Sequence, residues 1–276
     1  MRVDLHLHSH VSDGDLSPTA LVHAASEAAL DVIALTDHDT AEGVSEALSA
    51  AADLPISVIP GIEISTRSDP HEFHILGYWI DPDAPSMRNH AQGAATRRLQ
   101  RMEKMVERLR ALGVPITMEE VHTAAGPDVR TLGRPHLARA LLAGGFIRSF
   151  NEAFLRFIGD GGPAFVEQDF PSPRAAIEAI HQAGGVAVWA HPPLHLVEDL
   201  LPAFVEWGLD GVECNRPNLT PGEIEHLRAL ASHAQLLVTG GSDWHGPRRN
   251  FELGTFWLRP EQVSQLLAVG GIVAAS

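Results

Sequence analysis

The chain has 276 residues, of which 45% are hydrophobic and 20% are charged, and its net charge at pH 7 is −15. This composition is typical of a globular protein with a sizeable core and excludes wholesale disorder. An acidic chain is a poor partner for long nucleic acid, and no apolar run approaches the roughly 18 residues that cross a bilayer. The opening segment MRVDLHLHSH lacks the apolar stretch of a signal peptide, and the single cysteine, Cys214, cannot form an internal disulfide. We therefore expect a cytoplasmic protein with no membrane partner.

Seven short apolar runs predict buried strands. Helix-start signals, each a Ser or Thr followed by Pro, stand between several of these runs, at Ser17-Pro18, Ser172-Pro173 and Thr220-Pro221. Alternation of strands and helices favours a mostly parallel sheet or a β/α barrel. The predicted strands cover residues 3–6, 32–36, 56–59, 73–80, 186–191, 211–214 and 236–239.

The stretch between the fourth and fifth predicted strands breaks this alternation, because residues 88–158 have a mostly helical pattern. Residues 88–148 are also basic: eleven Arg and Lys against five Asp and Glu give +6, in a chain whose remainder carries −21. Such a segment is either a solvated helix face or a lid that meets an anionic substrate. We predict a helical insertion domain, the substrate-binding lid, at residues 83–162, and a barrel domain made of residues 1–82 and 163–276.

Imidazole and carboxylate side chains occur where the predicted strands end. Side chains alternate along a strand, so His6 and His8 share one face of the first strand and can bind one ion together. In a β/α barrel the strand ends form a single face, which carries the active site. The candidate ligands are His6, His8, Asp13, His38, Glu63, His74, His191, Asp243 and His245.

Nine such groups are too many for one ion with four to six ligands, so the sequence predicts two or three divalent ions and a bridging carboxylate. Imidazole and carboxylate ligands suit Zn, Mn and Fe. Glu63 follows a buried strand, where a carboxylate is costly unless it is paired or bound to metal. We expect Glu63 to be the bridge.

Taken together, the H-x-H pair, the T-D-H-D of residues 36–39, the G-I-E ending at Glu63, the His191-Pro192 pair and the late S-D-x-H resemble the PHP (polymerase and histidinol phosphatase) family of phosphoesterases. The resemblance covers residues 1–82 and about 163–260. It implies an α/β fold, a distorted seven-stranded β/α barrel, with a trinuclear metal centre at the carboxyl ends of its strands. It also implies that Asp4 and Asp37 orient the imidazoles. The implied ligand sets are His6, His8, Glu63 and Asp243 for one ion, Glu63, His74 and His191 for a second, and Asp13, His38 and His245 for a third.

The insertion resembles that of the PHP subgroup that acts on nucleotide phosphates and short oligonucleotides, which has an Arg-x-His there. Arg134 and His136 match this motif, and with Arg216 they are expected to contact substrate phosphate. By its residues alone, Arg134 also suits a solvated helix start, with Pro135 in the first turn. The resemblance implies removal of the 3′-phosphate of nucleoside 3′,5′-bisphosphates, and exoribonuclease action on short 5′-phosphorylated RNA. The expected partner is a small anionic phosphorylated substrate, and no obligate protein partner is evident.

Three other functions compete with this interpretation. An amidohydrolase also begins with H-x-H, but many members bridge their ions with a carbamylated lysine, and the one lysine here, Lys104, lies in the insertion. Histidinol-phosphate phosphatase is the alternative within the family, although the basic insertion suits a more anionic substrate. A non-catalytic metal- or phosphate-binding module is the third alternative, against which the complete ligand set argues.

Overall fold

The computed structural model describes residues 1–126, 132–247 and 251–272. The chain forms two compact units, one of residues 1–91 with 170–276 and the other of residues 92–169. Helix α3 (Pro85–Ala111) begins in the first unit and ends in the second. The predicted domain boundaries near residues 83 and 162 stay predictions. Two charged residues of the basic segment, Asp128 and Arg130, lie outside the described residues.

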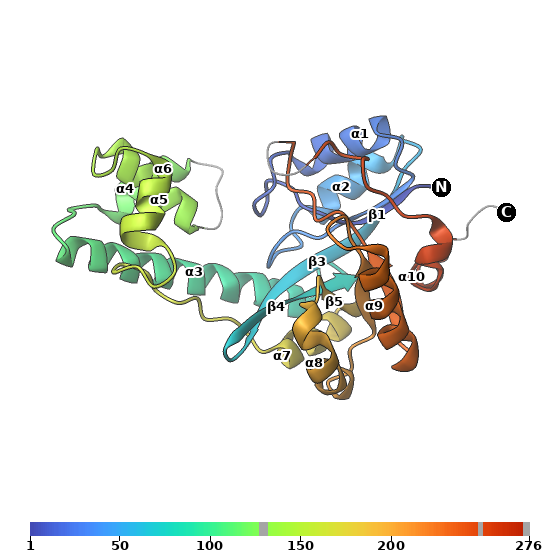
Figure 1. Cartoon of the computed structure of the whole chain (residues 1–276). Helices are drawn as coiled ribbons and strands as arrows, with labels where there is room; N and C mark the ends of the chain where they lie inside the picture. Colours follow the sequence, from blue (N-terminus) through green and yellow to red (C-terminus); the bar gives the residue numbers. More distant parts are fainter. Residues whose placement is uncertain (127–131, 248–250, 273–276) are drawn as a thin grey trace. The chain divides into compact units, whose positions relative to one another are not determined.

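The first unit is built on a seven-stranded sheet whose strands are arranged in chain order. Figure 1 labels β1, β3, β4 and β5 of this sheet. All pairs are parallel except those of β4, which runs antiparallel to both β3 and β5. A parallel bridge between Leu7 and Trp244 links β1 to the segment after β7. The distorted seven-stranded β/α barrel is thus confirmed. The strands are β1 (Val3–Leu7), β2 (Val32–Leu35), β3 (Ser57–Ser68), β4 (His71–Tyr78), β5 (Val186–Ala190), β6 (Gly211–Asn215) and β7 (Leu237–Gly240).

The β3–β4 hairpin is longer than the apolar runs predict. Its register pairs Gly61 with Tyr78 at one end and Ser68 with His71 at the other. The polar tip of the hairpin is exposed and carries no apolar signal, but backbone pairing continues through it. Glu63 therefore lies within a long strand rather than after the end of one.

Helices flank the strands, and their starts follow the predicted signals. The side chains of Ser17, Ser172 and Thr220 each accept a hydrogen bond from the backbone N–H three residues later, which caps α1, α7 and α9. Trp189 of β5 stacks on Phe204 of α8, with ring centroids 4.2 Å apart, and anchors part of the core. The helices are α1 (Pro18–Glu27), α2 (Val44–Ala51), α7 (Pro173–Gln182), α8 (Leu194–Glu206), α9 (Pro221–His233), the short 3-10 helix η2 (Pro260–Gln262) and α10 (Ser264–Val269).

The second unit is helical and has its own apolar core. That core packs residues of α3, such as Met105 and Leu109, against residues of α5, such as Leu137. Besides α3, the unit contains α4 (Met118–Ala125), α5 (Arg134–Ala143), α6 (Phe150–Ala153) and the π-helix η1 (Phe154–Ile158). Across the described residues of the chain, no helix has both the length and the apolar character to cross a membrane.

Candidate metal centre

Glu63 stands at the centre of a cluster of histidines. Its side chain is fully buried, and its Oε1 lies 2.9 Å from Nδ1 of His74 and 2.9 Å from Nε2 of His191. A single carboxylate therefore contacts imidazoles from several strands, which is the geometry expected of a bridging ligand. The other oxygen, Oε2, lies near His6 Nε2 (3.2 Å), His8 Nε2 (3.3 Å) and His38 Nδ1 (3.2 Å).

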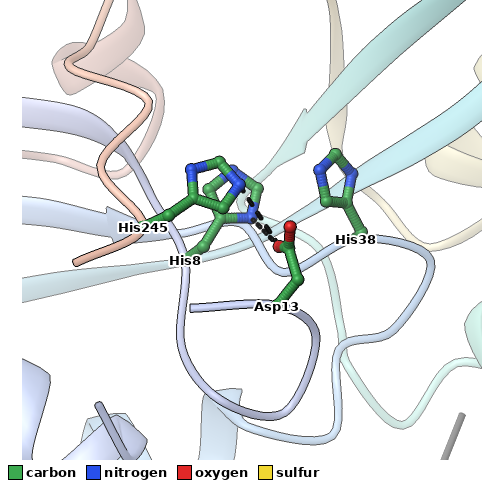
Figure 2. Close-up of side chains that lie close together, drawn as sticks. All are labelled: His8, Asp13, His38 and His245. Atoms are coloured by element: carbon green, nitrogen blue, oxygen red, sulfur yellow. Dashed lines mark ion pairs between the residues drawn. The ribbon is translucent and has the colours of Figure 1, made fainter. Parts of the chain in front are cut away.

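A second group gathers around Asp13, as Figure 2 shows. Its Oδ1 lies 3.2 Å from Nε2 of His245 and 3.9 Å from Nδ1 of His8. The rings of His8 and His245 are stacked with centroids 4.0 Å apart. With His38, these residues offer four ligand atoms that all lie within 4.8 Å of one another.

Asp243 completes the cluster from the segment after β7. Its Oδ1 lies 3.2 Å from Nε2 of His8 and 3.4 Å from Nε2 of His6. His6, His8, Glu63 and Asp243 again offer ligand atoms within 4.8 Å of one another, and so do His38, Glu63 and His74. The structure thus brings together all nine side chains that the sequence singled out.

Backbone pairing explains why His38 points at this cluster. The loop after β2 is held beside Glu63 by two hydrogen bonds: the N–H of Glu63 donates to the carbonyl of Asp37 (3.0 Å), and the N–H of Asp39 donates to the carbonyl of Glu63 (2.8 Å). His90, which the sequence did not suggest, lies 3.1 Å from Asp39 through its Nε2. Asp39 also accepts from the N–H of Ser65 at 3.0 Å, so its carboxylate ties the loop to β3.

Asp37 and Asp4, the two carboxylates expected to orient imidazoles, accept hydrogen bonds from the loops next to the candidate ligands. Asp37 accepts from the N–H and the hydroxyl of Ser9 (2.7 and 2.6 Å) and from the hydroxyl of Ser12 (2.6 Å). Asp4 accepts from the N–H of Ser242 at 2.8 Å, and burial raises its pKa to about 7. A different carboxylate contacts the ring of His6: Oε1 of Glu213 lies 2.9 Å from its Nδ1. Glu213 was not among the residues predicted from the sequence.

The chemistry of the donor set fits metal ions. Neither ring nitrogen of the buried His8, nor Nδ1 of His38, makes a hydrogen bond of good geometry, although Nε2 of His8 and Nδ1 of His38 each lie within 3.3 Å of Oε2 of Glu63. Each imidazole in its neutral form offers one nitrogen lone pair to a cation. Burial alone lowers the pKa of His8, but the nearby carboxylates of Asp243 and Glu63 outweigh burial and raise that pKa to about 9. A field that favours a proton on His8 favours any cation. Burial also lowers the pKa of His38 to about 3, so this imidazole is neutral and able to bind metal.

Comparison with known proteins identifies the family. The family model named PHP domain matches residues 4–91. Over 258 residues, the chain is 37% identical to a 5′-3′ exoribonuclease from Haemophilus influenzae, an alignment that covers 92% of this chain and 93% of the relative. The chain belongs to the PHP family. This PHP chain is also 32% identical to a 3′,5′-nucleoside bisphosphate phosphatase from Chromobacterium violaceum, over 89% of the chain and 87% of the relative.

A solved structure from Bifidobacterium adolescentis, described as a metal-dependent phosphoesterase, agrees with this assignment. It matches the PHP chain with a TM-score of 0.81 and 33% identity, over 96% of this chain and 95% of that one. The PHP chain is accordingly a metal-dependent phosphoester hydrolase, as the motifs predicted.

The Arg-x-His motif of the PHP chain lies at the start of α5. Nη1 of Arg134 lies 2.6 Å from Oδ1 of the exposed Asp160, and its guanidinium lies over the rings of Phe154 and Phe165. His136 accepts a hydrogen bond at Nδ1 from the N–H of Gly133 (2.9 Å). Burial and then the charge of Arg139 lower the pKa of His136, so the ring is neutral and its Nε2 carries the proton. A Nε2–H of this kind can donate to a phosphate oxygen.

Cys214 of the PHP chain lies on β6, and Arg216 directly follows that strand. Arg216 donates from Nη2 to the carbonyl of Pro192 (3.3 Å), while its buried Nε has no partner. Cys214 is buried, burial raises the pKa of its thiol to about 12, and its sulfur lies 3.5 Å from the carbonyl of Val212. A thiol in this state is not a nucleophile at neutral pH.

Proposed function

We propose that this protein hydrolyses phosphate monoesters of nucleotides and removes the 3′-phosphate of nucleoside 3′,5′-bisphosphates. The observation that carries the proposal is the convergence of nine imidazole and carboxylate side chains, Glu63 and Asp13 among them, into the donor set of a multinuclear hydrolytic centre. The relative from Chromobacterium violaceum, named for activity on these bisphosphates, supports the choice of substrate.

The proposed cofactors are two or three divalent ions, Mn, Zn or Fe. The groups of converging atoms overlap: His8 belongs to the groups around both Glu63 and Asp13, and His38 also lies near Glu63. This overlap supports neighbouring ions that share ligands. The proposed sets remain His6, His8, Glu63 and Asp243 for one ion, Glu63, His74 and His191 for a second, and Asp13, His38 and His245 for a third.

Divalent ions held in this way supply Lewis-acid activation of both water and the phosphate ester. The chain contributes the rest. The thiol of Cys214 is buried and protonated, so we assign the attack on phosphorus to water and not to this thiol. His8 and His38 each offer one ring nitrogen to a cation, and the hydrogen bonds that Asp37 accepts from Ser9 and Ser12 hold the loop after β1 in place.

We assign the recognition of a second phosphate to Arg134 and His136. The ion pair of Arg134 with Asp160 involves a largely exposed carboxylate (82% exposed), and such surface pairs contribute little stability. A dianionic phosphate can therefore replace Asp160 at small cost, and the Nε2–H of His136 can donate beside it. Arg216, with its unpartnered Nε, is proposed as a phosphate contact near β6.

The decisive experiment measures phosphate release from adenosine 3′,5′-bisphosphate, 5′-AMP, 3′-AMP and histidinol phosphate in the presence of Mn²⁺. We expect the bisphosphate to give the highest kcat/KM, because a monophosphate loses the binding energy of the remote phosphate. The proposal fails if the bisphosphate is no better than the monophosphates. It also fails if histidinol phosphate is the best of the four, a result that would favour a histidinol-phosphate phosphatase.

Short 5′-phosphorylated RNA is proposed as a second substrate. The name of the relative from Haemophilus influenzae supports it, since that protein is called a 5′-3′ exoribonuclease. We expect stepwise release of nucleotides from the 5′ end of a 5′-phosphorylated RNA pentamer, and a slower reaction on the same pentamer with a 5′-hydroxyl. Equal rates on the two pentamers would contradict recognition of the 5′-phosphate.

A further inference from the structure

Glu213 connects two of the candidate ligands through one carboxylate. It lies on β6, and its side chain is fully buried. Its Oε1 lies 2.9 Å from Nδ1 of His6, on β1, and its Oε2 accepts a hydrogen bond of 2.7 Å from the backbone N–H of His191, at the end of β5. A buried carboxylate is costly unless it is fully engaged, and here each oxygen has a partner.

The first contact sets the state of the His6 ring. An ionised carboxylate can only accept, so Nδ1 of His6 must carry a proton. In the neutral ring the lone pair then lies on Nε2, which faces Oε2 of Glu63 (3.2 Å) and Oδ1 of Asp243 (3.4 Å). The carboxylate of Glu213 therefore selects the one tautomer of His6 that directs a lone pair into the cluster.

The second contact holds the backbone of His191. This residue has φ of +31°, in the left-handed region that a residue with a side chain rarely adopts. Such a conformation persists only where neighbouring contacts enforce it, and the N–H of His191 is fixed by Glu213. In this conformation Nε2 of His191 lies 2.9 Å from Oε1 of Glu63.

We propose that Glu213 is the positioning residue shared by two neighbouring ion sites: one oxygen fixes the tautomer of His6, and the other fixes the backbone of His191. The inference rests on the metal centre proposed above. It assigns a role that neither ligand can fulfil alone, because His6 and His191 come from strands that do not pair with each other. Occupancy of the two sites should then be lost together when the carboxylate is changed.

Glu213→Gln tests this role without a large change in volume. The amide has one accepting oxygen and one donating nitrogen, so it cannot accept from both His6 and His191. We expect the affinity for Mn²⁺, titrated by electron paramagnetic resonance, to fall about 10- to 100-fold relative to the wild type. Val212→Ala is the matched control, since Val212 lies on the same strand but packs in the apolar core. It should lower thermal stability and keep the Mn²⁺ affinity.

A second measurement reports on the tautomer in the wild-type protein, independently of the variant's folding. In the Zn²⁺-loaded protein with ¹⁵N-labelled histidine, His6 should show a protonated Nδ1 in nuclear magnetic resonance spectra. The resonance is assigned by its loss in His6→Gln, and it should shift or disappear in Glu213→Gln. A protonated Nε2 on His6 in the wild type would overturn the proposal.

The outcomes separate this inference from the proposed function. If the wild type binds Mn²⁺ and folded Glu213→Gln binds it equally well, the role of Glu213 is refuted while the metal centre stands. Equal weakening in Val212→Ala and Glu213→Gln also refutes it, because the effect then follows stability. If the wild type itself binds no divalent ion, the metal centre and this inference fail together.

Discussion

The replacement Glu63→Gln tests the centre of the site most directly. The carboxylate is fully buried, and five imidazole nitrogens lie within 3.3 Å of its two oxygens. Glutamine has nearly the same shape, so the fold should survive. It removes one negative charge, however, and turns an accepting oxygen into a donating amide at the point where the ligand atoms converge.

The size of the effect follows from Coulomb's law. At an effective dielectric constant of about 20, two unit charges about 4 Å apart interact by about 4 kcal/mol. Loss of the Glu63 charge should therefore weaken the binding of an adjacent cation by at least about 1,000-fold, since each tenfold change corresponds to about 1.4 kcal/mol. A divalent ion doubles the charge, so this value is a lower bound.

The assay is metal content per chain by mass spectrometry after dialysis against micromolar Mn²⁺, together with phosphatase turnover and circular dichroism. We expect Glu63→Gln to lose metal and nearly all turnover while its spectrum stays native. Glu178→Gln is the matched control, because Glu178 lies on α7 with an exposed side chain paired to Arg174 at 2.9 Å. Native metal content and turnover in Glu63→Gln would refute the bridging role.

Three further predictions concern the rest of the protein. Arg134→Ala should lower kcat/KM for adenosine 3′,5′-bisphosphate by about 10- to 150-fold, since a charge-assisted contact contributes roughly 1.5–3 kcal/mol. Asp160→Asn should retain that activity, and a small aryl phosphate should not distinguish Arg134→Ala from wild type; equal losses on both substrates would contradict phosphate binding. Iodoacetamide at pH 8 should alkylate Cys214 only after unfolding, because burial raises the pKa of its thiol to about 12 and the thiol is therefore protonated at pH 8. Removal of metal with EDTA should abolish turnover and lower the Tm, and Mn²⁺ should restore both, since a ligand at 100 times its Kd stabilises by about 2.7 kcal/mol; an unchanged Tm would contradict the metal centre.

Local sequence determines much of the barrel. The apolar runs that become β1, β2 and β5 are short, and the side chains of Ser17 and Thr220 cap their helices through the backbone N–H three residues later. Signals of this kind depend on neighbours along the chain, so they can be found without a structure. The same holds for candidate ligands next to strand ends, such as His8 and His191, because strand ends in a barrel share one face. Glu63 and His74 instead lie within β3 and β4.

Pairing between segments that are distant in the chain could not be predicted from these local signals. The extension of the β3–β4 hairpin to His71 depends on cross-strand hydrogen bonds of polar residues, which leave no hydrophobic pattern. The antiparallel direction of β4 is also a tertiary choice, because a buried apolar strand has the same pattern in either direction. The sequence therefore predicted the strands but not the mixed sheet.

The partners of individual side chains show the same division. The role of Asp4 and Asp37 in orienting imidazoles, which the resemblance implied, stays a prediction, whereas Glu213, which lies 2.9 Å from Nδ1 of His6, was not among the predicted residues. A lone acid within the apolar run 211–214, which becomes β6, was the available signal. Which strand that acid faces depends on how the sheet curls, and a hydrogen bond between residues 207 positions apart is fixed only when the packed core brings their atoms together.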